Sequence, residues 1–148
     1  MKKHESGRSM IEMVGVLAVM GLITAGAFVL MRSGMASQKR NRVQDEVANI
    51  ATNIRTLSAS LDDFSNLPKP DDFEKGGVEF LDNLEIQTTT PLGGDTRYSV
   101  TADKKQFTVY ILNPSRKECY ALEQVGWSEG TAQCLFDKNK AFTITYGK

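Results

Sequence analysis

The sequence predicts an α+β fold in which a long N-terminal helix packs on a small antiparallel sheet, with a disulfide near the C-terminus. Three observations predict it. An uncharged apolar run from Met13 to Met31 leads into an amphipathic helical pattern. Short segments of alternating apolar and polar residues follow after residue 96. Two cysteines, Cys119 and Cys134, lie downstream of the apolar run.

The apolar run from Met13 to Met31 is nineteen residues long and carries no charge. As a helix it spans roughly 28 Å, which is close to the roughly 30 Å thickness of the hydrocarbon core of a bilayer. We therefore predict a transmembrane segment at 13–31. Glu12 stands directly before the run, where a carboxylate is costly to keep near lipid and requires a cationic partner. This position suggests a role beyond simple anchoring.

The helical pattern continues beyond Met31. Residues 32–42 are polar and basic, and an apolar stripe at spacings of three and four follows, formed by Val43, Val47, Ile50, Ile54, Leu57 and Leu61. Such a stripe is typical of a helix with one buried face. Pro68 and Pro70 prevent the helix from continuing. We predict one helix over 8–61, roughly 80 Å long if continuous, with its second half packed against a sheet.

Residues 62–148 are expected to form one globular region. Its first part, 62–96, is rich in turn residues and contains one short helix near 78–83. Alternation then predicts strands from Arg97 to Ala102 and over 107–112, joined by a hairpin turn at 103–105.

The C-terminal part is predicted to begin with a helix. Asn113 is a candidate N-cap with Pro114 at the first helical position, and the helix would run to about Val125. Two more strands are expected, at 132–136 and 141–146, around a turn at 137–140.

The two cysteines are fifteen positions apart. Downstream of an export segment, a lone pair of cysteines indicates a disulfide. Closing a loop of that size contributes roughly 3 kcal/mol in the chain-entropy model. The alternative is two free thiols in a cytosolic protein. If bonded, Cys119 and Cys134 would join the C-terminal helix to the third strand.

The N-terminal segment GRSMIEMVGVLAVMGLIT resembles the start of type IV pilins and pseudopilins. In that family a short basic leader ends in Gly, a membrane peptidase cuts after this Gly, and the fifth mature residue is Glu. The resemblance implies a leader at 1–7, cleavage between Gly7 and Arg8, and an assembly role for Glu12. It also implies methylation of the new N-terminal amine, although the family usually has Phe, Met or Leu where this chain has Arg8. The globular region resembles that of type IVb pilins more loosely.

The resemblance implies a structural subunit that is processed by the prepilin peptidase and polymerised with other copies by inner-membrane pilus assembly machinery. Before assembly it would be a single-pass inner-membrane protein in contact with lipid, with its globular region in the periplasm. Afterwards it would be part of an extracellular filament that serves adhesion, motility, DNA uptake or conjugation.

Two alternative functions remain open: a pseudopilin of a type II secretion machine, and a soluble exported binding protein. The N-terminus can also be interpreted as an uncleaved signal anchor, with Lys2 and Lys3 in the cytoplasm. It can further be interpreted as a secretory signal peptide cut after Ala25-Gly26-Ala27.

The composition argues against several function classes. The formal net charge is zero, so no basic excess indicates a nucleic-acid partner. The single histidine, His4, lies in the predicted leader, so imidazole catalysis and imidazole metal ligands are not expected in the mature chain. We expect neither enzyme activity nor a cofactor. Calcium at Asp137 and Asn139 is the alternative considered, but lysines interleave them and no acidic cluster follows.

Overall fold

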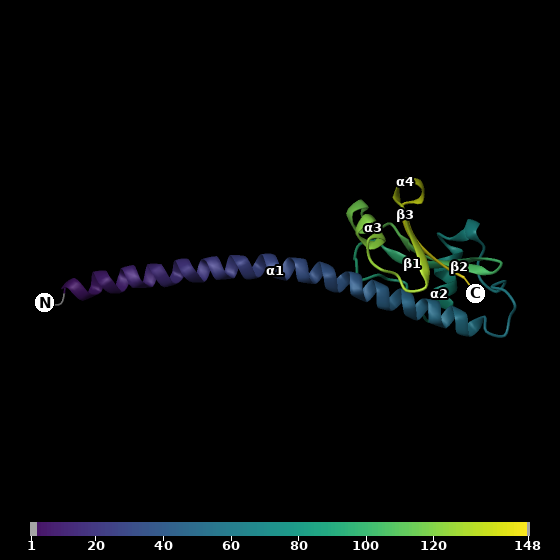
Figure 1. Cartoon of the computed structure of the whole chain (residues 1–148), viewed down its shortest axis with the longest axis horizontal. Coiled ribbons are helices and arrows are strands. Elements are labelled where there is room, and N and C mark those ends of the chain that lie inside the picture. Colours follow the sequence, from purple (N-terminus) through teal and green to yellow (C-terminus); the bar gives the residue numbers. More distant parts are fainter. Residues whose placement is uncertain (1–2, 148) are drawn as a thin grey trace. The chain divides into compact units, whose positions relative to one another are not determined.

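The computed structural model describes the backbone of residues 3–147 and the side chains of residues 9–147 (Figure 1). The helices and strands are α1 (Lys3–Leu57), the 3-10 helix η1 (Pro70–Asp72), α2 (Gly76–Asn83), β1 (Arg97–Asp103), β2 (Gln106–Leu112), α3 (Arg116–Glu123), β3 (Gly130–Leu135), α4 (Phe136–Asn139) and β4 (Ala141–Gly147). The chain divides into two compact units, Met1–Gln38 and Lys39–Lys148. We call the second the head unit. The predicted α+β class is confirmed.

Helix α1 ends at Leu57, four residues before the predicted end at Leu61. The buried stripe consists of Val43, Val47, Ile50 and Ile54. Leu57 and Leu61 are 43% and 38% exposed, so the prediction that they continue the stripe is wrong. Beyond the helix the Ser58 hydroxyl bonds the Asn66 side chain at 3.2 Å.

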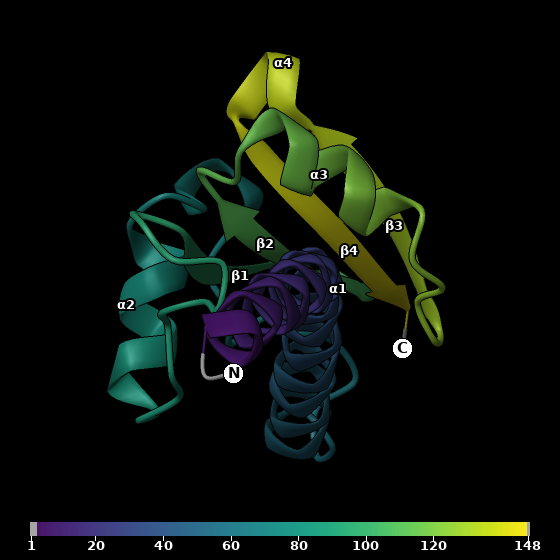
Figure 2. The same ribbon diagram turned by 90° about the vertical axis from the view of Figure 1, so that its left-hand side faces the viewer.

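The head unit contains a four-stranded antiparallel sheet in the order β1-β2-β4-β3. Its inner face carries large apolar side chains that share one core with the α1 stripe: Tyr98, Val100, Phe107, Val109, Ile111, Phe142, Ile144 and Tyr146. Helix α3 adds Cys119 and Leu122 to this core. Figure 2 shows α3 in front of the sheet and α2 beside β1. The hydrophobic effect of this shared core is the main force that holds the second half of α1 to the sheet.

The opposite face of the sheet is covered near β1 and β2 by the segment that follows α1. Phe73 stacks on Tyr110 with ring centroids 5.0 Å apart, and the Ser99 hydroxyl donates to the carbonyl of Phe73. Gly77 lies so close to β1 that a Cβ there would come within 2.7 Å of the Val100 carbonyl oxygen. A glycine is therefore required where α2 crosses the strand.

The C-terminal elements follow the predicted order with corrected ends. Helix α3 is capped by Ser115 and not by Asn113, because the Ser115 hydroxyl and the Glu118 carboxylate form a reciprocal capping box. Asn113 instead has a positive φ of 54° and precedes the helix. Helix α3 ends at Glu123 rather than at Val125. The strand predicted at 132–136 is β3, Gly130–Leu135, and Phe136 instead begins the single-turn helix α4, which overlaps the turn expected at 137–140.

Candidate functional site: the exposed apolar helix and the stapled head

The first half of α1 presents its apolar side chains on all sides. Between Met13 and Met31 the large apolar residues are exposed by fractions that run from 55% at Val16 to 76% at Leu22. One window of this helix reaches a mean hydropathy of 2.4 with none of its residues buried, so by length and composition it is able to cross a membrane. Soluble monomers rarely expose continuous apolar surfaces of this size, so this surface requires lipid or other protein.

Two hydroxyl side chains, one within the apolar run and one just beyond it, form hydrogen bonds inside the helix. The Thr24 hydroxyl donates to the carbonyl of Met20 at 2.7 Å, and the Ser33 hydroxyl donates to that of Leu30 at 2.9 Å. Both bonds stay within the helix, which suits an environment without water because unsatisfied polar groups are costly in lipid. At the end of the run, the guanidinium of Arg32 lies 4.6 Å from the centroid of the Phe28 ring.

Three predicted residues lie near the start of α1. Glu12 is in the helix, one position before the apolar run, and its side chain is exposed. Gly7 and Arg8 lie in helical backbone, but their side chains are outside the described part of the chain. The predicted cleavage between Gly7 and Arg8 and the assembly role of Glu12 therefore stay predictions.

Cys119 and Cys134 are joined by a disulfide, with their Cα atoms 5.5 Å apart. Cys119 lies on the inner side of α3 and is fully buried, and Cys134 is in β3 next to it. The bond joins α3 to the edge strand of the sheet, as the sequence predicted. Because β3 pairs only with β4, this covalent link fixes a strand that the ladder holds from one side.

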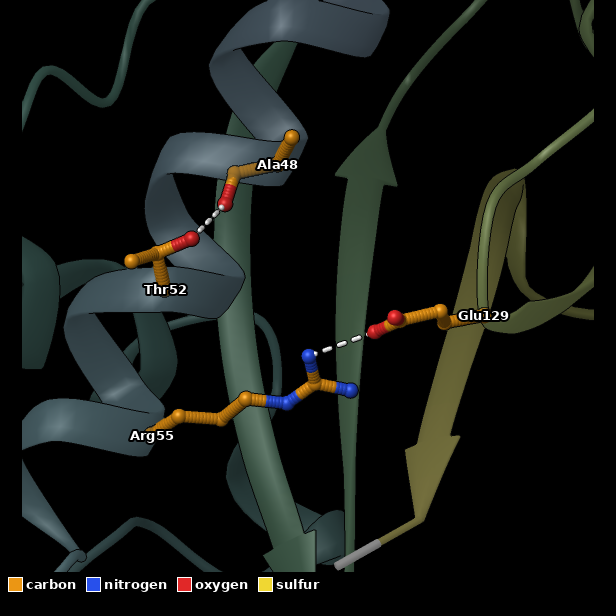
Figure 3. Close-up of polar contacts among 4 residues, drawn as sticks. All are labelled: Ala48, Thr52, Arg55 and Glu129. Atoms are coloured by element: carbon orange, nitrogen blue, oxygen red, sulfur yellow. Dashed lines mark hydrogen bonds and ion pairs between the residues drawn. The ribbon is translucent and has the colours of Figure 1, made fainter.

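The loop between α3 and β3 is fastened to α1. The Gln44 side chain donates to the carbonyl of Gly126 at 2.8 Å. Further along α1, the Arg55 guanidinium pairs with the Glu129 carboxylate at 2.7 Å. Figure 3 shows the Arg55 side chain extending from α1 toward that carboxylate. The Trp127 ring packs against Phe142 in a tilted arrangement, with ring centroids 5.6 Å apart. Together these contacts connect the second half of α1 to the stapled end of the head unit.

A further polar contact ties α1 to β1, an edge strand of the sheet. The hydroxyl of Tyr98, which is fully buried, donates to the Glu46 carboxylate at 2.6 Å. Burial raises the pKa of Tyr98 well above its ordinary value, and the neighbouring Glu46 carboxylate raises it further. The contact orients α1 on the sheet, since the apolar stripe alone allows the helix to slide.

Sequence reasoning missed these three tethers. Gln44, Glu46 and Arg55 flank the apolar stripe, and nothing in their spacing shows which strand or loop they will meet. The capping box could have been predicted from the sequence, because Ser115 and Glu118 have the S-x-x-E spacing.

Asp137 is one of the two residues considered as calcium ligands in the sequence. This carboxylate pairs with Arg116 at 2.7 Å. Within the described residues, no group of three or more His, Cys, Asp or Glu side chains is placed to hold a metal ion.

Comparison with curated proteins gives two matches, each described as the major structural subunit of bundle-forming pilus. They come from Escherichia coli O127:H6 (strain E2348/69 / EPEC) and Escherichia coli O111:H-. Each is 26% identical to the chain over 112 residues. The chain resembles the type IVb pilins. The alignment covers 74% of the chain and 58% of each relative, so the chain spans little more than half the length of the proteins it matches. No protein-family model matches, and no solved structure does.

Proposed function

We propose that this chain is a structural subunit of a type IV pilus of the type IVb kind. One observation carries the proposal: a single helix, α1, is apolar and exposed through its first half, and it ends as the buried spine of a stapled sheet domain. Such a helix has two environments available, a bilayer and the interior of a filament of like chains. The similarity to pilus subunits over 112 residues supports the second as its final place.

The start of the chain supports processing by a prepilin peptidase between Gly7 and Arg8. The leader, residues 1–7, carries two lysines and ends in the small residue Gly7. A residue next to a scissile bond must fit a tight pocket, and glycine fits most easily. Cleavage leaves the apolar run intact and makes Glu12 the fifth residue of the mature chain.

Glu12 then serves assembly. Its carboxylate meets the N-terminal amine of a neighbouring copy, because opposite charges attract strongly in a low-dielectric filament core and either alone is costly to bury. Arg8 is four residues earlier on the same helix, at the spacing that allows an internal pair. That pair lowers the cost of keeping Glu12 next to lipid before assembly.

The disulfide supports a periplasmic position for the head unit before assembly, because disulfides persist in oxidising compartments. The chain is anchored by residues 13–31 in the inner membrane and is then transferred by the assembly machinery into an extracellular filament of its own copies. The apolar helix exchanges lipid for like helices, so the transfer does not require its surface to enter water.

The first experiment is mass spectrometry of the mature chain from membranes. We expect an N-terminus at Arg8, and Gly7→Leu should block processing. A mature N-terminus at Phe28 would instead show a secretory signal peptide, and the chain would be an exported soluble protein.

The second experiment compares sheared filaments with membrane pools on an immunoblot. Glu12→Gln should insert and be cleaved normally but give few filaments. Arg8→Phe, which restores the usual family residue, is the matched control and should be tolerated. Normal filament yield from Glu12→Gln would remove the assembly role from this carboxylate.

A further inference from the structure

The net charge of zero conceals a separation of charge along the chain. The part of α1 between the apolar run and the buried stripe carries Arg32, Lys39, Arg40 and Arg42 and no acidic residue. We call residues 32–42 the basic segment. The head unit, by contrast, has a net negative formal charge, and one stretch of it carries the excess of acidic residues. Residues 62–85 contain eight acidic side chains against two lysines, and we call them the acidic segment.

The basic segment lies on an exposed part of helix α1. Lys39 and Arg42 are exposed, and their spacing of three places their side chains on one side of the helix. The described ion pairs of the chain, Arg55–Glu129 and Arg116–Asp137, use neither of these residues. Within the described residues, these two cations therefore face solvent.

The acidic segment forms an ordered surface of the head unit. It includes η1 and α2, which pack beside β1 (Figure 2). Seven of its eight carboxylate residues are exposed: Asp62, Asp71, Asp72, Glu74, Glu79, Asp82 and Glu85. Two of these help to hold the fold, because Asp72 accepts from the Gly76 amide and Asp82 accepts from the Thr88 hydroxyl. Asp71 and Glu74 have no such bond within the described part of the chain.

We infer that the basic segment of one copy binds the acidic segment of a second copy. This inference rests on the proposed function and adds to it a contact outside the apolar helix. The two segments are different surfaces, so the contact is heterologous and leaves an unused segment of each kind at the two ends of any pair. Repeated contacts of this kind build an open helical filament rather than a closed dimer. Complementary charge also selects the register between neighbouring copies.

A second copy fits both segments better than an anionic lipid surface does. Lipid headgroups would attract the basic segment. They would, however, leave the acidic segment without a partner and would repel it from the same surface. Only a partner that supplies both signs of charge satisfies both segments, and the chain itself is such a partner.

The test is a charge reversal with rescue in the full chain. Lys39→Glu with Arg42→Glu reverses the basic segment, and Asp71→Lys with Glu74→Lys reverses the acidic one. Each pair alone should lower the yield of sheared filaments by roughly tenfold, because like charges then face each other. All four changes in one chain should restore most of the yield. Lys117→Glu with Lys138→Glu makes the same charge change at exposed positions of α3 and α4 and should leave the yield unchanged.

Formation of the disulfide and resistance to protease show in each variant that the head unit has folded. Normal yield from either reversed pair, or no rescue by the fourfold variant, would overturn the inference. Loss of yield without rescue but with weaker membrane retention would identify lipid as the partner of the basic segment.

A second measurement is independent of filament yield. Zero-length carbodiimide cross-linking of mixed isotope-labelled wild-type chains in membranes should join Lys39 of one copy to a carboxylate of the acidic segment of another. If wild-type chains form no filaments, the proposed function fails, and this cross-link still decides the contact. Its absence would overturn the inference even in a chain that forms filaments.

Discussion

The two halves of helix α1 are both rich in apolar residues, yet their environments are opposite. In the first half, Val19 and Leu22 are 57% and 76% exposed. In the second half, Val47 and Ile54 are fully buried. Helix propensity does not explain the difference in burial, since Val, Ile, Leu and Ala occur in both halves. The difference lies in how the apolar side chains are distributed around the axis: on every side in the first half, and on one stripe in the second. The first half of the helix is therefore suited to an apolar environment, and the second half to packing on the sheet. The following predictions test this difference between the two halves.

The largest effect is expected from placing the same charge in each half. Val47→Asp buries an unpaired carboxylate in the core and should cost more than about 3 kcal/mol of head stability. Val19→Asp should leave head stability unchanged but weaken membrane retention. Trp127 is the only tryptophan and lies in the head unit, so its fluorescence during denaturation of the full chain in detergent reports the head alone. Equal effects of the two variants on that transition would contradict this difference between the halves.

Removal of the disulfide should be the next largest effect. Cys119→Ser should lower head stability by about 3 kcal/mol, because an open loop of 15 residues regains entropy when the chain unfolds. Cys134→Ser should behave alike, and a reductant should reproduce the effect in the wild-type chain. Membrane retention should not change, since the bond lies wholly in the head unit. An unchanged Trp127 transition would show that the bond does not stabilise the fold.

Tyr98→Phe should have an intermediate effect. It removes a hydrogen bond to a carboxylate and should cost about 1–2 kcal/mol at neutral pH. The folded-state pKa of Tyr98 is raised, so the folded chain retains this proton at pH values where the unfolded chain loses it. The stabilisation from this group is therefore present below the unfolded pKa of about 10 and falls as pH rises above it.

The variant should accordingly lose less stability than the wild type between neutral pH and pH values above about 10. Tyr120→Phe is the matched control, because Tyr120 is 44% exposed and should change neither quantity. An alkaline transition of the same steepness in wild type and Tyr98→Phe would show that folding does not raise the pKa of Tyr98.

The smallest effect is expected at the tether between Arg55 and Glu129. Both side chains are substantially exposed, at 43% and 69%. Arg55→Ala should therefore cost less than about 1 kcal/mol, and the cost should shrink in high salt. A double-mutant cycle with Glu129→Gln isolates the pair. A coupling that survives high salt would show that the tether is more buried than the structure has it.

Several elements of the fold could be predicted from the sequence because their signals are local. Alternation of apolar residues identified β1 and β2, and the stripe from Val43 to Ile54 identified the buried half of α1. The ends of elements were predicted less well. Leu57 has the spacing of a stripe residue but is 43% exposed in the folded chain. Asn113 followed by Pro114 has the appearance of a cap, but the capping box of Ser115 and Glu118 satisfies more backbone donors.

The sequence by itself determined that the chain has a uniformly apolar helical segment, an amphipathic continuation, a small sheet domain and a cysteine pair, because composition and period are properties of neighbouring residues. The tertiary structure alone decided the strand order β1-β2-β4-β3 and the partners of Gln44, Glu46 and Arg55. These contacts join residues 52 to 82 positions apart. Such pairs leave no periodic signal, because each depends on how every intervening element packs, and only the folded core brings them within reach of one another.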